Sequence, residues 1–588
     1  MLYSKSPMSN DGPFVQLPRT TTIKSKDHSS PPPPIKSSAV PNIFFSAANI
    51  LQPVPPVHTP PFSPAISGYH TPRMPPPPPA TVQNCEVYGI SDTAGVTIPA
   101  PFSCEDVPGR RAKAGKLNGG IAAATSSELF KSPAPWKPMA KRLDHRLSAE
   151  SKARKSTVLK SLATHLANPG IISLGGGLPS SDYFPFEHFD IKVPAEGKSA
   201  YDLSIALNYG QSSGAAQMIR WVTEHTEIVH NPPYRDWGCT LSAGSTSSLD
   251  MVYRMFLEKG DYVISENYTF ATAVETSHPL GCKFIGVDMD SEGMLPDALD
   301  ELLTTWDVAA RSARKPFLVY TVPTGQNPTG ATQSTERRRK IYAVAQKHDL
   351  VIIEDEPYYF LQMQPYTGPG QPPAPLPANH KEFLKSIIPS LLSMDVDGRV
   401  VRLDSFSKVL APGSRCGWVV APDQICERMQ RHAEVSTQHP AGISQVILHR
   451  LVDEEWGHGG YLDWLINLRV EYTQRRDVLM KACDDHLPRE ICSWTPPAAG
   501  MFHWMHLDVS KHPDFGKRSV QSIEDEVFKT AVAGGVLITP GSYFLADGEA
   551  ELQQIFFRAT FAAAASEAMV EAIRRFGVAI RQVFRIEN

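Results

Sequence analysis

The chain has 588 residues and a formal net charge of −4, with 57 Lys and Arg residues against 61 Asp and Glu residues. This balance gives no overall field that would attract nucleic acid or an anionic membrane. No apolar run reaches the about 18 residues that a transmembrane helix needs, and the N-terminus lacks the apolar core of a secretory signal, so we expect no membrane span and no export.

The first 140 residues differ from the rest because they carry the proline tracts 31–34 and 75–79 and show no sustained hydrophobic period. Such a segment cannot bury enough apolar surface to offset its ordering entropy, so we predict a disordered extension. The tracts could be spacers or ligands of SH3- or WW-type modules. The serine-rich, basic start is compatible with a mitochondrial transit peptide, but its prolines disfavour an amphipathic helix, which favours the cytoplasm.

From about residue 143 onward, strand-like runs alternate with helical periodicity. The expected strands are 262–265, 283–287, 317–322, 351–354, 400–404 and 417–420, and the expected helices include 248–257 and 335–348. This alternation predicts an α/β fold with a mixed, mainly parallel sheet between helices. Ligands in such folds bind beyond the carboxyl ends of the strands, where the polar motifs below occur.

The first two candidate residues, Ser245 and Thr246, follow Gly244 at the start of a predicted helix. Free backbone N–H groups and two hydroxyls at a helix start can bind a phosphate, although an ordinary helix cap has the same composition. Phe270 follows the strand 262–265. Its ring could stack on an aromatic cofactor or simply pack in the core.

The loop 323–330 reads PTGQNPTG and follows a predicted strand. Two glycines and two prolines make a turn by themselves. Asn327 in this loop nevertheless presents a rigidly held amide that could reach both a cofactor oxygen and a substrate carboxylate.

Asp355 follows the apolar run 351–353, and Tyr358 comes three residues later. A carboxylate at this strand end could keep the pyridine nitrogen of pyridoxal phosphate (PLP) protonated, and Tyr358 could bind the ring oxygen. A solvated strand-end acid and a core aromatic are the alternatives.

The segment Ser405-Phe406-Ser407-Lys408, followed by Arg415, comes directly after a buried strand. A lysine at a strand end can hold the PLP aldehyde as a Schiff base, while the hydroxyls and the guanidinium hold its phosphate. A surface lysine at a strand end is the alternative. Arg558 lies in an apolar stretch near the C-terminus and needs an anionic partner, either a substrate carboxylate or a structural ion pair.

These residues, in this order, resemble the fold-type I PLP aminotransferases of the class I/II superfamily over roughly residues 143–588. The stretches that look like the fungal-type aromatic amino acid aminotransferases and the kynurenine/2-aminoadipate aminotransferases are 172–179, 183–185, 383–385, 399–408 and 499–504. The resemblance implies a large PLP-binding domain (201–450) and a small domain built from the N-terminal segment 141–200 and the C-terminal part 451–588.

The resemblance also implies a role for each site residue. Lys408 would be the Schiff-base lysine and proton shuttle, Asp355 would bind the ring nitrogen, and Asn327 and Tyr358 would bind the ring oxygen. The phosphate would be held by Ser245, Thr246, Ser405, Ser407, Arg415 and, from the partner subunit of a homodimer, Tyr209. Substrate would meet Gly177, Asn327 and Arg558, and no metal is implied. The chain departs from the family at Thr246, where glutamine is frequent, and at Phe270, where tyrosine is usual.

The reaction that the resemblance implies is transamination of Phe, Tyr or Trp with a 2-oxo acid such as 2-oxoglutarate. 2-Aminoadipate and kynurenine are alternative substrates, and a PLP lyase or decarboxylase of the same fold is an alternative activity. A retained carboxylate-binding Arg558 disfavours decarboxylation. A transcription regulator would need a basic DNA-binding module, which segment 1–140 does not offer, and the complete residue set disfavours an inert enzyme that acts only through its tail.

Overall fold

The computed structural model describes residues 206–586 apart from 369, 370 and 373, residues 170–185 apart from 178, and the single positions 109, 112, 113, 158, 165 and 168. The predicted disordered extension, with its proline tracts and the SH3- or WW-type contact, falls almost entirely outside these residues.

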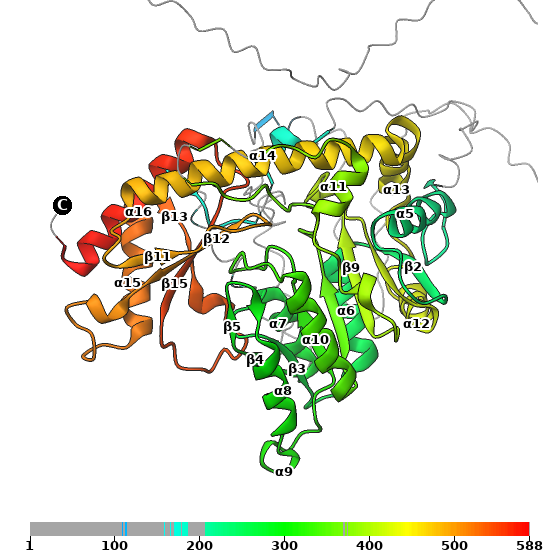
Figure 1. Cartoon of the computed structure of the whole chain (residues 1–588), viewed down its shortest axis with the longest axis horizontal. Helices are drawn as coiled ribbons and strands as arrows, with labels where there is room; N and C mark the ends of the chain where they lie inside the picture. The colour runs from blue at the N-terminus through cyan, green and yellow to red at the C-terminus, as the bar shows by residue number, and fades with distance from the viewer. Residues whose placement is uncertain are drawn as a thin grey trace, which may run out of the picture. The chain divides into compact units, whose positions relative to one another are not determined.

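A seven-stranded sheet forms the centre of the large part of the fold (Figure 1), in the order β2-β10-β9-β8-β7-β3-β4. Its strands are β2 (Trp237–Ser242), β3 (Tyr262–Glu266), β4 (Lys283–Val287), β7 (Leu318–Thr321), β8 (Val351–Asp355), β9 (Val400–Ser405) and β10 (Gly417–Pro422). Strands β3, β4, β7, β8 and β9 run parallel, whereas β10 is antiparallel to both of its neighbours. The predicted mixed, mainly parallel sheet is therefore confirmed, with β2 as an additional edge strand.

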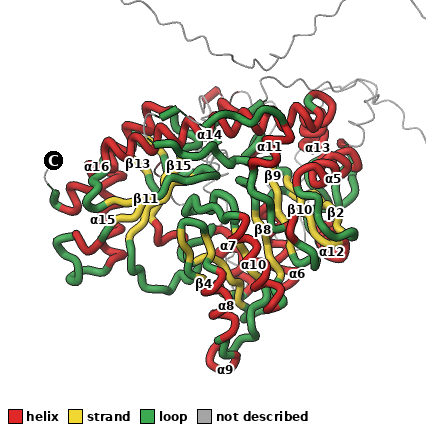
Figure 2. The backbone as a smooth tube through the Cα atoms, viewed as in Figure 1, coloured by secondary structure: helices red, strands yellow, loops and turns green. Residues whose placement is uncertain are grey.

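Helices flank this sheet (Figure 2). They are α5 (Ala216–Val229), α6 (Ser245–Phe256), α7 (Ala271–Ser277), α8 (Pro296–Thr304), α9 (Val308–Arg311), α10 (Thr335–His348), α11 (His380–Ser386), α12 (Asp423–Glu434) and α13 (Gly442–His449). Helix α10 coincides with its predicted range. It begins after Ser334, whose hydroxyl accepts a hydrogen bond from the Arg337 N–H at 3.2 Å, as expected of a helix cap.

A second, antiparallel sheet lies in the C-terminal part of the chain, with strand order β11-β12-β15-β14. Its strands are β11 (Cys492–Trp494), β12 (Phe502–Leu507), β14 (Thr539–Pro540) and β15 (Ile555–Thr560). It is accompanied by α14 (Gly457–His486), α15 (Val520–Ala533) and α16 (Ser566–Phe584). Helix α14 contacts α16 on this side and α11 beside the large sheet, and so spans both parts (Figure 1).

Two short strand pairs complete the described fold. Strand β1 (Ile172–Ser173) pairs in parallel with β13 (Val536–Leu537), and β5 (Met289–Asp290) pairs with β6 (Gly293–Met294). The pairing of β1 brings residues 174–177 next to the C-terminal sheet, where the N–H of Thr560 donates to the carbonyl of Leu174 at 2.8 Å. Among the described residues, no helix has the length and apolarity to cross a membrane, and no cluster of His, Cys, Asp and Glu could hold a metal ion.

Candidate active site

The candidate residues of the large sheet converge because β7, β8 and β9 are parallel neighbours, so their carboxyl ends lie at one edge. Asp355 is the last residue of β8 and Ser405 is the last residue of β9. Asn327 lies in the loop after β7, and Lys408 follows β9. The register pairs Asp355 with Leu403, which places the carboxylate close to the segment that carries Lys408.

Asp355 is buried and only half satisfied. Its Oδ2 accepts a hydrogen bond from the Tyr320 hydroxyl at 2.8 Å, whereas Oδ1 has no hydrogen-bond partner in the described part of the chain. Burial raises the pKa of Asp355 to about 6 and Asp404 acts in the same direction, against the lowering effects of Tyr320, Lys408 and Ser245. A buried acceptor of this kind needs a donor from a ligand.

Tyr320 was not predicted from the sequence. It lies on β7, where the register pairs it with Ile353, two residues before Asp355 and therefore on the same face of the sheet. The signal that could have found it is a hydroxyl-bearing aromatic residue in an otherwise apolar buried strand, one strand away from the predicted ring-nitrogen acid.

The Nζ of Lys408 donates a hydrogen bond to the Gly177 carbonyl at 2.7 Å. Burial, together with the nearby Arg415 and Arg558 and against the opposing effect of Asp355, lowers the pKa of Lys408 to about 8. The solvated-lysine alternative is therefore disfavoured, because Lys408 lies among charged groups and not at an open surface. Its amine loses its proton close to neutral pH, as a group that carries protons requires.

A cradle with anion-binding character lies beside Lys408. Helix α6 begins at Ser245, after Gly244, which has a φ of 98°. A Cβ at Gly244 would come within 2.5 Å of Arg415 Nη2, so only glycine lets the guanidinium lie this close to the helix start. Arg415 donates to the Ser407 hydroxyl at 3.3 Å, and the Ser405 hydroxyl donates to Ser407 Oγ at 2.9 Å.

The cradle combines a cation, hydroxyls and the free N–H groups of the first turn of a 12-residue helix. The Ser245 hydroxyl is buried without a hydrogen-bond partner among the described residues, whereas the Thr246 side chain is exposed. The predicted phosphate residues of this chain are therefore gathered in one place, with Thr246 at the periphery.

Arg558, on β15, is 1 % exposed and has only neutral partners within the described residues. Its Nη1 donates to Asn327 Oδ1 at 2.7 Å and its Nη2 to the Gly175 carbonyl at 2.6 Å, while its Nε is unpartnered. The guanidinium also lies over the rings of Phe502 and Phe544, at 4.4 and 4.7 Å from their centroids.

Burial lowers the pKa of Arg558 to about 10. A buried cation without a carboxylate is costly unless a ligand supplies the negative charge. The structural ion pair, which the sequence left open as an alternative, does not occur in the described part of the chain. Arg558 and Asn327 therefore form a site that suits a carboxylate ligand.

The remaining candidates take different places. Tyr358 is buried, its ring meets Phe502 edge-on at 5.6 Å, and burial raises the pKa of its hydroxyl. Phe270 is partly buried and precedes α7, packed against the core, so plain core packing still accounts for it. Tyr209 is 86 % exposed.

Two close contacts with the backbone of residues 500–502, which the sequence did not predict, hold the Asn327 loop in place. A Cβ on Gly325 would lie 2.4 Å from Gly500 Cα, and a Cβ on Gly330 would lie 2.6 Å from the Phe502 carbonyl oxygen. Both glycines of the loop have positive φ. The loop is therefore packed tightly against the chain that enters β12.

The family model described as aminotransferase class I and II matches residues 193–576. The chain is also 45 % identical to an aromatic amino acid aminotransferase of Schizosaccharomyces pombe, over 76 % of this chain and 99 % of that protein. The protein belongs to the class I and II aminotransferases. A mitochondrial kynurenine/alpha-aminoadipate aminotransferase of Bos taurus is 33 % identical, over 74 % of this chain and 98 % of its own length.

A crystal structure of an aminotransferase from Candida albicans has the same fold, with a TM-score of 0.62 and 42 % identity, covering 76 % of this chain and 100 % of that one. The family resemblance inferred from the sequence is thus confirmed. Aminotransferases of this family imply PLP, and the residues present fit it: Asp355 Oδ1 offers an unpaired buried acceptor, Lys408 offers an amine, and the cradle at α6 and Arg415 offers an anion site.

Proposed function

We propose that this aminotransferase uses PLP to transfer the amino group of an aromatic amino acid to a 2-oxo acid such as 2-oxoglutarate. The observation that carries the proposal is Arg558: a buried guanidinium with no carboxylate partner among the described residues, fixed by Asn327 and close enough to lower the pKa of Lys408. Amino acids and 2-oxo acids share the α-carboxylate that such a site binds.

Three groups of residues would hold the cofactor. Asp355, oriented by Tyr320, would accept from the ring nitrogen, and Asn327 and Tyr358 would contact the ring oxygen. The phosphate would lie in the cradle formed by Ser245, Thr246, Ser405, Ser407 and Arg415, with Phe270 against the ring. When bound, PLP supplies an aldehyde carbon that condenses with amines and a ring that accepts electrons.

The residues of this chain would act on the substrate in sequence. Arg558 and Asn327 bind the α-carboxylate through parallel hydrogen bonds, which fixes the direction of the Cα–H bond. Lys408, as a neutral amine, takes the α-proton and later returns it one carbon away, a contribution of about 10²–10⁴-fold. The Gly177 carbonyl holds Nζ at 2.7 Å and so limits where the amine can point before substrate arrives.

Aromatic substrates are supported by the name of the relative at 45 % identity, and 2-aminoadipate or kynurenine by that of the relative at 33 %. A PLP lyase of the same fold is the second candidate activity, because Lys408 and Asp355 would serve it equally well. The carboxylate site at Arg558 favours transamination over decarboxylation, since it keeps the carboxylate bound.

We also propose a homodimer. Tyr209 is 86 % exposed and the nearby Leu207 is 63 % exposed, so this segment offers surface that a second subunit could cover. In the dimer, Tyr209 would reach the phosphate of the partner subunit.

We further propose that the chain divides into an extension (1–140), a large domain (201–450) and a small domain (141–200 with 451–588). We also propose a cytoplasmic location.

The deciding experiment is a single half-reaction. Purified protein loaded with PLP is mixed, without any 2-oxo acid, with Phe, Tyr, Trp, kynurenine, 2-aminoadipate or Glu in turn. We expect one equivalent of 2-oxo acid product per site, a change in the absorbance of the bound cofactor, and the fastest rate with an aromatic amino acid. Cofactor absorbance that no amino acid changes would overturn transamination and favour the lyase. An active monomer in gel filtration would overturn the dimer.

A further inference from the structure

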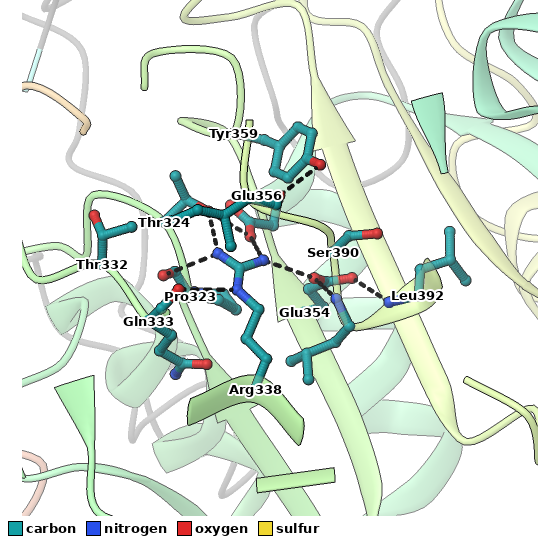
Figure 3. Close-up of polar contacts among 12 residues, drawn as sticks. Pro323, Thr324, Thr332, Gln333, Arg338, Glu354, Glu356, Tyr359, Ser390 and Leu392 are labelled. Atoms are coloured by element: carbon teal, nitrogen blue, oxygen red, sulfur yellow. Dashed lines mark hydrogen bonds and ion pairs between the residues drawn. The ribbon is translucent and has the colours of Figure 1, made fainter. Parts of the chain in front are cut away.

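A second group of buried polar residues lies around Arg338 (Figure 3). We call Arg338, Thr324, Glu354 and Glu356 the Arg338 cluster. Arg338 comes from α10, Glu354 from β8 and Thr324 from the Asn327 loop, and all four side chains are at most 2 % exposed. Because Glu354 and Glu356 flank Asp355 in an extended segment, their side chains point away from the site while that of Asp355 points into it.

Arg338 holds the Asn327 loop at both ends. Its Nη2 donates to the Thr324 hydroxyl at 2.7 Å and to the Pro323 carbonyl at 3.3 Å, where the loop leaves β7. Its Nε donates to the Gln333 carbonyl at 3.2 Å, where the loop returns to α10. One guanidinium thus fixes the entrance and the exit of the loop that carries Asn327 (Figure 3).

The same guanidinium holds the segment that carries Asp355. Arg338 Nη1 lies 3.4 Å from Glu356 Oε1 and 3.7 Å from Glu354 Oε1. The Thr324 hydroxyl donates to Glu356 Oε1 at 2.9 Å, so it links the loop to the residue directly after Asp355. Glu354 in turn accepts from the N–H groups of Leu391 and Leu392 at 2.7 and 3.1 Å, which ties the cluster to the rest of the fold.

We propose that Arg338 is a positioning residue that fixes Asn327 and Asp355 relative to each other, with the Thr324 hydroxyl as the link between the two segments. The names of the ligands involved rest on the proposed function: Asn327 would touch the substrate carboxylate and Asp355 the cofactor ring. Stability alone does not require this arrangement, because well-packed apolar side chains of similar volume serve a core as well as buried ions do. The cluster lies where the Asn327 loop leaves β7 and where β8 ends, so it links this loop to the end of the strand that carries Asp355.

The test uses Thr324, because loss of the Arg338 side chain would leave buried carboxylates unpaired and could prevent folding. Thr324→Val removes the linking hydroxyl at almost constant volume, and Thr324→Ser keeps it. Thr226→Val is the matched control, because Thr226 is equally buried and lies on α5. Its hydroxyl donates to the local helix carbonyl of Val222, and its Oγ1 lies 3.8 Å from Cys239 Sγ.

Hydrogen–deuterium exchange and steady-state kinetics test the positioning role of Arg338. Hydrogen–deuterium exchange of the full chain, without added cofactor, should be roughly tenfold faster in residues 323–333 and 355–361 of Thr324→Val than in the parent protein. In the transamination assay, Thr324→Val should raise KM for the amino acid by roughly tenfold, with a smaller effect on kcat. Thr324→Ser should restore both values, and Thr226→Val should change neither.

Equal lowering of the thermal midpoint by Thr324→Val and Thr226→Val, with unchanged exchange in the two segments, would overturn the positioning role. An increase in exchange confined to residues 323–333 would also overturn the proposal, because it would show that the two segments are not coupled. Since the exchange measurement needs neither cofactor nor activity, it decides the role of Arg338 even if the parent protein fails to transaminate, a result that would overturn only the proposed function.

Discussion

Two groups of buried charges differ in how they are satisfied. What we call the paired face is the side of the large sheet with Arg338 and Arg402, and what we call the unpaired face is its other side with Asp355, together with Arg558 of the C-terminal sheet. On one face, Arg338 and Arg402 are paired with carboxylates of the chain itself, Arg402 with Asp404 at 2.7 Å and Glu354 at 3.2 Å. On the other face, Arg558 and Asp355 have neutral partners and an unpaired atom each within the described residues. Burial alone therefore does not mark a ligand site, and the lack of an ion pair at both Asp355 and Arg558, close to Lys408, is what favours a ligand there.

The comparison predicts different effects for substitutions on the two faces. On the paired face, loss of a charge strands its partner in the core and should reduce the stability of the fold. On the unpaired face, loss of a charge removes a cost of burial, so function should suffer while the fold persists or gains stability. The following substitutions test this division.

Lys408→Ala should have the largest effect, with kcat reduced by at least about 10³-fold because the proposed proton carrier is lost. The cofactor-free variant should nevertheless be more stable than the parent protein at pH 7. Burial lowers the pKa of Lys408 from 10.5 to about 8, so the charged lysine destabilises the fold below pH 8, and this penalty disappears as the pH rises toward 10.5. Thermal unfolding across this pH range measures it.

Lys385→Ala serves as the control for Lys408, since Lys385 is a surface residue that pairs with Glu382 at 3.1 Å. It should leave both kcat and the pH dependence of stability unchanged. A Lys408→Ala protein that unfolds more easily than the parent protein at pH 7 would contradict the division between the two faces.

Arg402→Met should lower the free energy of unfolding by about 3–5 kcal/mol, because Glu354 and Asp404 would lose their shared cation in the core. Urea denaturation followed by tryptophan fluorescence would measure the change. Arg431→Met, at an exposed arginine that pairs with Glu427 and Glu434, should leave the unfolding midpoint nearly unchanged. Equal effects of the two substitutions would show that the paired face does not stabilise the fold.

Arg558→Lys should lower kcat/KM for the amino acid by about 10²-fold, chiefly through KM, because a lysine cannot form two parallel hydrogen bonds to a carboxylate. The unfolding midpoint should stay within the range of the parent protein. Arg469→Lys is the matched control, since this partly buried arginine on α14 binds only the Ser386 hydroxyl among the described residues, at 2.6 Å. Unchanged KM in Arg558→Lys would show that the carboxylate binds elsewhere.

Tyr320→Phe should have the smallest effect, roughly tenfold weaker cofactor binding at pH 7, through loss of one hydrogen bond to Asp355. Tyr320 lowers the pKa of Asp355, which burial has raised to about 6, so its removal should raise that pKa further. As the pH falls, cofactor affinity should therefore decline at a higher pH in the variant than in the parent protein. Titration of the cofactor-free proteins with PLP at several pH values would measure both affinity curves. If the curves of the variant and the parent protein coincide, Tyr320 does not tune Asp355 for cofactor binding.

The sequence predicted the α/β class and the strands that end at the site, because apolar runs and the residues that follow them are local features. Lys408, Asp355 and Asn327 were singled out because each follows a predicted strand, and Arg558 because it interrupts an apolar stretch. The strand register then brought the first three together without any further assumption.

Other parts of the site could not be predicted, because they depend on pairings between distant segments. Tyr320 reads as a core aromatic until the register of β7 and β8 is known, and Arg338 reads as a surface residue of a charged helix, since three arginines and a lysine follow one another there. The partners of Arg558 at Gly175 and Phe544 come from segments that no local pattern links to β15.

The contact between Arg558 and the Gly175 carbonyl has a consequence for synthesis on the ribosome. These two residues are 383 positions apart, and β1 can pair with β13 only after Val536 has been made. The large sheet can form while the chain is still growing, but the contact between Arg558 and Gly175 can form only after β15 has been made. A nascent chain therefore has Lys408 and the cradle at α6 before Arg558 can reach Gly175.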